Sequence, residues 1–185
     1  MSKKIFNEYV TDLTESLSKL DFNVVNKVIE IFSNKIKNGN YIFLIGNGGS
    51  SATPSHSAGD FSKELGAKCI CLTDNTPSVT AWSNDTSYSN IFKGQLSTFL
   101  SENDLVVGYS GSGNSENVLL AMEFAQKNGA TTIGVTGNYN DKGPGKISKF
   151  SDTLVFFETT SMERIEDLQL IFNHMIKESL KIKND

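Results

Sequence analysis

YIFLIGNGGSS, residues 41–51, is the stretch that decides the fold, because a continuous apolar run leads directly into a loop of glycine and serine. A second stretch, DLVVGYSGSGNS at residues 104–115, repeats the arrangement. Continuous apolar runs of this length are typical of strands that are buried on both faces of a parallel sheet. Loops that follow such strands lie at the carboxyl edge of the sheet, where ligands of α/β folds bind.

The rest of the chain extends this pattern. Short apolar runs rich in β-branched and aromatic residues alternate with helical stretches, which predicts an α/β fold. We expect a three-layer sandwich, with a five-stranded parallel sheet between two layers of helices. The predicted strands are residues 41–46, 67–72, 104–110, 131–137 and 152–158.

Helices are expected at both ends of this core. Apolar residues at helical spacing predict helices over 2–20 and 22–38, with Asp21 capping the second helix and Gly39 following its end. The short junction predicts an antiparallel helical hairpin, and a further apolar stripe predicts a helix over 162–181. We expect a single domain over 1–185, composed of the hairpin (1–38), an α/β core (41–160) and a C-terminal helix (162–183).

The two glycine-serine loops carry the clearest chemical signal. Glycine lets the backbone approach a ligand closely, and free N–H groups at the start of the next helix favour an anion. Ser110, Ser112 and Ser115 add hydroxyl donors in the second loop. The lysine of a nucleotide P-loop is missing, and Ser51 stands where a dinucleotide loop has its third glycine. A small phosphate monoester fits better than a nucleotide, and the simpler alternative is a pair of tight turns.

Composition and charge exclude several classes of function. The chain has 185 residues, a net charge of −4 and a pI near 5.2, so it lacks the basic surface of a nucleic-acid-binding protein. We find neither a membrane-spanning run nor a signal peptide, and expect a cytoplasmic protein without membrane partners. Cys69 and Cys71 would point to opposite faces of a strand, so we expect buried packing and no disulfide.

The two histidines of the chain, His56 and His174, stand near carboxylates. His56 and Asp60 are four residues apart on one helix, while Glu166 and Asp167 precede His174 on another. Such sets can form a divalent metal site or a general acid–base pair, and the simpler alternative is hydrogen-bonded structural histidines. Glu166 and His174 lie eight residues apart, about 12 Å along a helix, so spacing supports a shared metal only weakly.

Four segments together resemble the phosphoheptose isomerases, which are members of the sugar isomerase (SIS) domain family. They occur in the family's order and, with the helices ahead of them, cover nearly the whole chain. A single GNGGS would not be specific, whereas the combination is. The segments are GNGGSSATPSHSAGDF (46–61), TAWSNDTSYSNIFKGQL (80–96), VVGYSGSGNSENVLLAMEFAQKNGATTIGVTG (106–137) and SMERIEDLQLIFNHMI (161–176).

The resemblance implies a flavodoxin-like SIS fold assembled as a homotetramer, with the N-terminal hairpin used in oligomerisation and active sites at subunit interfaces. It implies reversible conversion of sedoheptulose 7-phosphate to D-glycero-D-manno-heptose 7-phosphate, which feeds heptose synthesis for surface polysaccharide. It also implies substrate contacts in three segments. These are Asn47, Gly48, Gly49, Asn84 and Asp85 around the sugar, and Ser110, Gly111, Ser112 and Ser115 around the phosphate.

The resemblance further implies a metal site, often zinc, made by a His and a Glu four apart and a Gln and a His eight apart. The matching residues are His56, Asp60, Glu166 and His174. Asp60 stands where Glu is usual, and Glu166 stands where Gln is usual. These changes would favour a harder divalent ion, shift the role of base to Glu166, or reflect a different sugar.

Aldose–ketose isomerisation removes a proton from carbon 1, forms an enediol(ate) and returns a proton to carbon 2. We expect Asp60 as general base, with Glu166 as the alternative, and His174 as general acid. A divalent metal would polarise the carbonyl. Trp82 and Tyr88 are expected to pack in the core or an interface rather than to stack on substrate.

Three other functions remain open at this level. One is an isomerase that acts on another ketose phosphate. A second is a non-catalytic SIS tetramer that binds the replication initiator protein, as close relatives of the family do. A third is a sugar-phosphate-sensing regulatory domain, although no DNA-binding segment is attached. The presence of both histidines and of carboxylates at the matched positions favours catalysis.

Overall fold

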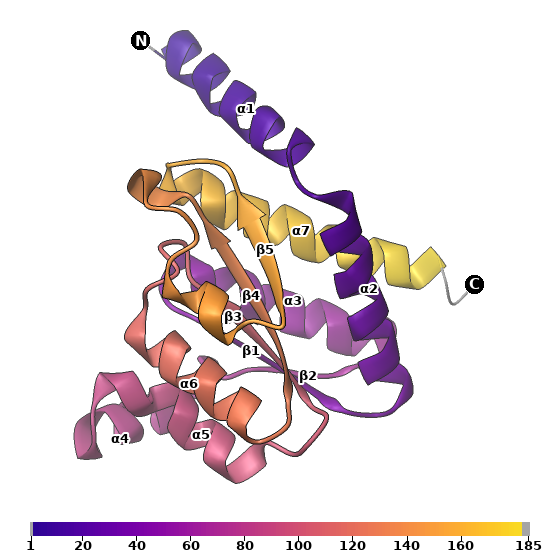
Figure 1. The fold of residues 1–185 in the computed structure, drawn as a ribbon, viewed down its shortest axis with the longest axis vertical. Helices are drawn as coiled ribbons and strands as arrows, with labels where there is room; N and C mark the ends of the chain where they lie inside the picture. Colours follow the sequence, from indigo (N-terminus) through magenta and orange to yellow (C-terminus); the bar gives the residue numbers. More distant parts are fainter. Residues whose placement is uncertain (1, 183–185) are drawn as a thin grey trace.

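The computed structural model describes residues 2–182, and within them a five-stranded parallel sheet lies between two layers of helices (Figure 1). The predicted fold class is confirmed. Three predicted strands, 67–72, 104–110 and 152–158, are one residue shorter at each end than expected. In the order in which they lie in the sheet, the strands are β2 (Lys68–Cys71), β1 (Tyr41–Gly46), β3 (Leu105–Tyr109), β4 (Thr131–Gly137) and β5 (Thr153–Phe157).

Helices cover both faces of this sheet. Helices α2, α3 and α7 lie over one face, and α4, α5 and α6 lie over the other (Figure 1). The helices are α1 (Ser2–Ser18), α2 (Phe22–Lys37), α3 (Gly49–Leu65), α4 (Thr76–Asp85), α5 (Ile91–Phe99), α6 (Glu116–Lys127) and α7 (Met162–Ile182). Short 3-10 helices are η1 (Tyr88–Asn90), η2 (Tyr139–Asp141) and η3 (Lys146–Phe150). None of the helices within residues 2–182 combines the length and apolar character needed to cross a membrane.

The alternation of side chains in β1 explains why its sequence is apolar without interruption. Ile42 and Leu44 pack with α2, α3 and α7, whereas Phe43 and Ile45 pack with α5 and α6. All four side chains are buried, because a parallel sheet covered on both faces has no solvent side. The strand signal in the sequence therefore came from burial rather than from polar–apolar alternation.

The two cysteines lie on β2 and correct one expectation. Cys69 and Cys71 do not point to opposite faces, because residues two apart on a strand share a face. Both are buried in the cluster under α2 and α3, and neither forms a disulfide. Burial raises the pKa of both thiols, so they pack as small hydrophobic residues, as expected.

The N-terminal helices form as predicted but are arranged differently. Asp21 caps α2 by accepting a hydrogen bond from the Asn23 backbone N–H at 2.9 Å. Figure 1 shows α1 extending away from α2 instead of folding back along it. The Arg164 guanidinium lies 3.1 Å from the Asp12 carboxylate, which joins α1 to α7. The expected antiparallel hairpin is thus replaced by a contact between α1 and α7, and apolar side chains of α1 stay exposed at Ile5, Phe6 and Val10.

The strand order positions the two glycine-serine loops. From the adjacent strands β1 and β3, the chain continues to β2 on one side of the pair and to β4 on the other. Such a switch point leaves a crevice at the carboxyl ends of the two strands, because the following helices go to opposite faces. The loops after β1 and β3 therefore lie side by side at one edge of the sheet.

Candidate active site

A cavity of about 270 Å³ lies between the two loops. The loop after β1, the loop after β3 and the first turns of α7 each supply part of its wall. Polar groups of the backbone and side chains therefore converge on a space suited to a small anionic ligand. The lining residues are Asn47, Gly48, Ser50, Tyr109, Ser110, Gly111, Ser112, Ser115, Met162 and Glu166.

The loop after β3 offers hydroxyl groups at the start of a helix. The Ser110 and Ser115 hydroxyl oxygens are 3.0 Å apart, and Ser112 lies on the same loop. Ser115 is the N-cap residue of α6, but its side chain makes no capping hydrogen bond to the helix. The positive end of the α6 dipole is thus directed at the cavity together with three hydroxyls, which suits a phosphate group.

At the start of α3, in contrast, a carboxylate of the protein itself, that of Glu166, is already present. The Glu166 carboxylate lies at the first turn of α3, where the Ser50 backbone N–H favours its charged form and by itself would lower its pKa. A Cβ atom on Gly49 would lie 2.2 Å from a Glu166 oxygen, so a larger residue there would displace this carboxylate from its position. Burial raises the pKa of Glu166, and repulsion from Glu163 and Asp167 adds to the shift.

Two asparagines join this cavity to a second one of about 560 Å³. The Asn47 and Asn117 carboxamides exchange hydrogen bonds of 2.8 Å, and the Tyr88 hydroxyl donates to Asn47 at 2.8 Å. Asn47 and Ser115 line both cavities. Tyr88 is 57% exposed and lines the second cavity, so it does not pack in the core of this chain, and its packing in an interface stays a prediction. Trp82, which packs closely over Gly94 of α5, does have a packing role.

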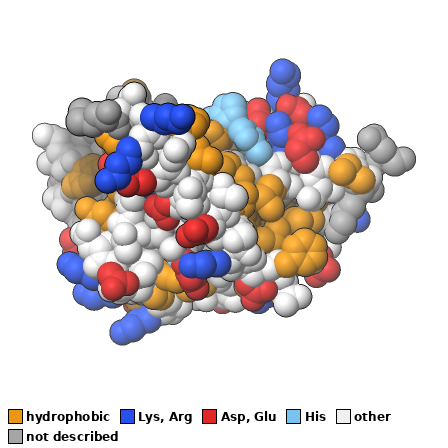
Figure 2. Space-filling model, turned by 90° about the horizontal axis from the view of Figure 1, so that it is seen from above, with side chains coloured by type: hydrophobic (Ala, Val, Ile, Leu, Met, Phe, Trp, Pro, Cys, Tyr) orange, Lys and Arg blue, Asp and Glu red, His pale blue; other side chains and the backbone are white. Residues whose placement is uncertain are grey.

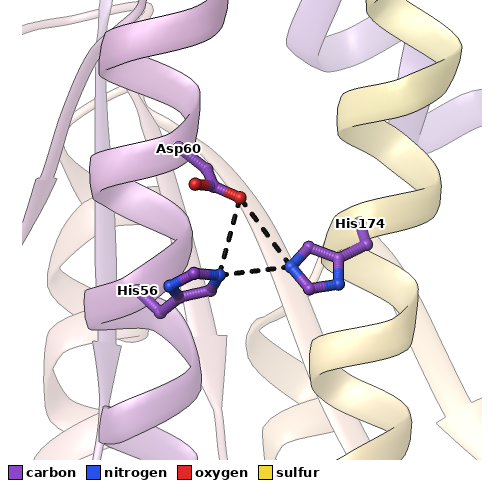
Figure 3. A group of neighbouring side chains, drawn as sticks. All are labelled: His56, Asp60 and His174. Atoms are coloured by element: carbon purple, nitrogen blue, oxygen red, sulfur yellow. Dashed lines mark hydrogen bonds and ion pairs between the residues drawn. The ribbon is translucent and has the colours of Figure 1, made fainter.

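A second constellation lies between α3 and α7 (Figure 3). His56 and Asp60 from α3 face His174 from α7, and we call these three residues the trio. The two Nε2 atoms are 3.2 Å apart, and they lie 3.5 Å (His56) and 3.7 Å (His174) from Asp60 Oδ2. Ligand atoms about 2.0–2.1 Å from a tetrahedral zinc ion lie roughly 3.3–3.4 Å from one another. The trio therefore has the donors and the spacing for a divalent cation, with one coordination position left open.

Lysine and carboxylate side chains adjoin the trio. Lys177, one turn after His174, places its Nζ atom 3.0 Å from Asp60 Oδ2. This hydrogen bond holds the pKa of the Asp60 carboxyl below its usual range. Figure 2 shows the histidine side chains at the surface, between a hydrophobic area and a cluster of acidic and basic groups.

A buried amide connects the trio to the cavity. The Tyr109 hydroxyl donates to Asn173 Oδ1 at 2.9 Å, and Asn173 Nδ2 donates to the Ser57 hydroxyl at 2.8 Å. Tyr109 lines the cavity, while Ser57 and Asn173 each adjoin a histidine of the trio in sequence. All three side chains are buried, so this bridge fixes how α7 sits on α3 and β3.

Comparison with known proteins agrees with this arrangement. The sequence model of a family described as the SIS domain matches residues 5–137, more than two thirds of the chain. The chain belongs to the SIS domain family. The resemblance inferred from the four segments is confirmed at the level of the family and its phosphoheptose isomerase members.

Its relatives in the SIS family include proteins named phosphoheptose isomerase. The one from Aliarcobacter butzleri is 35% identical over 157 residues, which cover 82% of this chain and 81% of the relative. The one from Aneurinibacillus thermoaerophilus is 34% identical over 167 residues, which cover 88% and 80%. The solved structure of phosphoheptose isomerase from Neisseria gonorrhoeae superposes with a TM-score of 0.89 at 25% identity, covering 97% of this chain and 96% of that one.

Most of the expected substrate-binding residues of this SIS domain line the cavity or adjoin it. Gly49 lies against Glu166, whereas Asn84 and Asp85 hydrogen-bond to each other at the end of α4 and line neither cavity. Their contact with substrate stays a prediction. Glu166, the fourth residue of the expected metal set, lies about 12 Å along α7 from His174 and is not part of the trio.

The sequence analysis assigned no role to two residues of the site, Asn117 and Lys177. Asn117 belongs to the matched segment 106–137 but had no assigned role, and no spacing rule links it to Asn47 seventy residues earlier. Lys177 could have been found, because a residue three positions after His174 lies on the same face of the helix.

We predict unequal effects for two Gly→Ala substitutions in α3. Gly59→Ala should stabilise the protein by about 0.5–1 kcal/mol, because the helix interior prefers alanine and nothing lies within 4 Å of the new methyl group. Gly49→Ala should stabilise the protein less than Gly59→Ala or not at all, since the methyl group has to displace the Glu166 carboxylate. Urea unfolding measures both, and adding Glu166→Ala should remove this difference. Equal effects at the two positions would contradict the placement of Glu166.

Proposed function

We propose that this SIS domain is a cytoplasmic sugar-phosphate isomerase that interconverts sedoheptulose 7-phosphate and D-glycero-D-manno-heptose 7-phosphate through an enediol(ate). The observation that carries the proposal is the cavity, where a half-buried carboxylate of raised pKa, Glu166, and the serine loop at the start of α6 both form part of the wall. A phosphate anchor and a proton acceptor in one cavity are what such a reaction needs. The relatives named phosphoheptose isomerase support this choice of substrate.

For binding, we assign the phosphate to Ser110, Gly111, Ser112 and Ser115. Three hydroxyls and the α6 dipole offset the charge of a phosphate without a lysine. The sugar chain extends along Asn47, Gly48 and Gly49 toward the second cavity, whose carboxamide and hydroxyl groups match sugar hydroxyls. Asn84 and Asp85 join these contacts in the bound state.

For the metal, we assign zinc to His56, Asp60 and His174. Glu166, which the resemblance also implied as a ligand, lies apart from them along α7 and is not assigned to the metal. Two imidazoles and a carboxylate are ordinary zinc ligands, and the spacing of the trio suits tetrahedral coordination. When bound, zinc supplies a Lewis acid at the carbonyl oxygen.

For proton transfer, we assign Glu166 as the base that removes the carbon 1 proton and returns a proton to carbon 2. Its raised pKa makes it a better proton acceptor near neutral pH than Asp60, whose pKa the Lys177 ammonium lowers. Asp60 remains the alternative base. His174 exchanges the proton of the substrate oxygens, so that no net proton is lost or gained in the isomerisation.

For assembly, we propose a homotetramer with active sites at subunit interfaces, to which the N-terminal helices contribute. The trio and the cavity lie about 12 Å apart along α7, so a second copy could bring its trio to the cavity of the first. Apolar side chains of α1, α2 and α7 are exposed on the single chain, as expected of an interface. They include Ile5, Phe6, Val10, Phe22 and Met175.

We expect the purified protein to convert sedoheptulose 7-phosphate to the aldose, observed by NMR with and without added zinc. His174→Gln should abolish turnover while leaving binding of the sugar phosphate, because the serine loop is untouched. Binding is measured by calorimetry. Absence of isomerisation by the wild-type protein, with zinc or after chelation, would refute the proposed activity, and other ketose phosphates in parallel reactions would reveal a different sugar.

We expect the kinetics of two variants to show whether Glu166 or Asp60 is the base. Glu166→Gln should lower kcat by about 100-fold or more, the usual contribution of a general base, with little change in zinc affinity. Asp60→Asn should lower zinc affinity and regain part of its kcat at high zinc concentration. The reverse result, near-normal kcat in Glu166→Gln, would assign the base to Asp60.

We expect chains with different defects to complement each other. His174→Gln and Glu166→Gln chains are unfolded, mixed in equal amounts and refolded. If each site combines the trio of one chain with the cavity of another, about one site in four is intact. The mixture should then regain activity that neither variant has alone. A mixture as inactive as its components would place the whole site within one chain.

A further inference from the structure

Three groups converge on one oxygen atom of the trio, Asp60 Oδ2. The Nε2 atoms of the histidines lie 3.5 and 3.7 Å away, and Lys177 Nζ is nearest at 3.0 Å. Oδ2 is therefore both the carboxylate atom closest to the imidazoles and the acceptor for an ammonium group. A metal ion and this lysine compete for the same atom.

Lys177 is held in this position by its surroundings. Its side chain is only 13% exposed, which is unusual for a lysine. Besides Asp60, two carboxylates lie near Nζ, Glu64 at 3.5 Å and Glu178 at 3.7 Å. The ammonium group is thus fixed within the α3–α7 interface and does not extend freely into solvent.

We propose that Lys177 is an internal competitor for the divalent cation of the trio and lowers the affinity of the site. The inference rests on the metal site of the proposed function. With the trio empty, Lys177 neutralises Asp60. When a cation binds, the lysine loses its place on Oδ2 and its charge repels the cation, because a unit charge within a few ångströms of a divalent ion acts strongly in a partly buried site.

Glu64 is the acceptor to which Lys177 moves. It lies one helical turn after Asp60 on α3, and its carboxylate already accepts a hydrogen bond from Lys181 at 2.8 Å. Lys177 can turn from Asp60 to Glu64 without becoming an unpaired buried charge. Glu64 therefore favours metal binding, although it contributes no ligand atom to the trio.

Zinc binding to the full-length protein tests this assignment directly. Dissociation constants are measured at one fixed pH by competition with a colorimetric zinc chelator. Lys177→Met, which keeps the length of the side chain, should bind zinc at least tenfold more tightly than wild type. Lys177→Arg keeps the charge and should stay within threefold of wild type. His174→Gln should lose the binding, which assigns the measured zinc to the trio.

A matched control variant distinguishes the loss of a positive charge beside the trio from the loss of a positive charge elsewhere on the protein. Lys127 pairs with Glu123 on α6, on the other face of the sheet, and its substitution removes the same unit of charge. Lys127→Met should leave the zinc affinity unchanged. Circular dichroism and thermal unfolding establish that each variant is folded.

Substitution of Glu64 should change the zinc affinity in the opposite direction to substitution of Lys177. Glu64→Gln should weaken zinc binding severalfold, because Lys177 then has a poorer alternative to Asp60. In the Lys177→Met background the same substitution should have no effect, since Glu64 acts through the lysine. An equal loss in both backgrounds would show that Glu64 acts on the metal without Lys177 and would overturn this part of the proposal.

Two results overturn the competitor role. Equal zinc affinities for wild type and Lys177→Met would show that the ammonium does not compete. Absence of zinc binding in every variant would also remove the metal from the proposed function. Neither result decides the activity, because isomerisation of sedoheptulose 7-phosphate by the wild-type protein is assayed independently, with zinc and after chelation.

Discussion

The hydrogen bonds of one buried amide, Asn173, hold together the parts on which the site depends. A buried carboxamide is stable only where its oxygen and nitrogen both find partners, and here the partners are Tyr109 and Ser57. The first comes from the sheet and the second from α3, so the position of α7 is defined relative to both. His174 follows Asn173 and His56 precedes Ser57, which means that the same contact sets the geometry of the trio.

The surroundings of Glu166 and Asp60 shift the pKa values of the two carboxyl groups in opposite directions. Glu166 is partly desolvated among other acidic groups, while Asp60 faces an ammonium group. Pairs of carboxyl groups that are tuned apart in this way are typical of acid–base sites. The shift of Asp60 arises mainly from Lys177 on another helix, and the shift of Glu166 arises mainly from burial, so neither shift could be predicted from the sequence distance between the two residues.

The sequence predicted most of the sheet and the phosphate loop because both are local signals. Strands such as 41–46 are apolar throughout, and glycine and serine stand directly after them. The features that were predicted wrongly or not at all depend on contacts between segments that are distant in the sequence. Helix α1 contacts α7 through pairs such as Asp12 with Arg164, and the pairing of Asn47 with Asn117 joins residues seventy positions apart. The two-residue period of a strand already places Cys69 and Cys71 on the same face, so the expectation of opposite faces was an error in the sequence analysis.

The occupied start of α3 makes the two ends of the cavity unequal. One helix terminus is open to an anion, whereas the Glu166 carboxylate lies against Gly49 at the start of the other. If the phosphate binds where we propose, a sugar with a single phosphate would enter with its charge toward α6. A sugar with phosphates at both ends would bring its second charge toward a carboxylate. On the proposed phosphate site, the Glu166 carboxylate beside Gly49 would therefore disfavour bisphosphates relative to monophosphates.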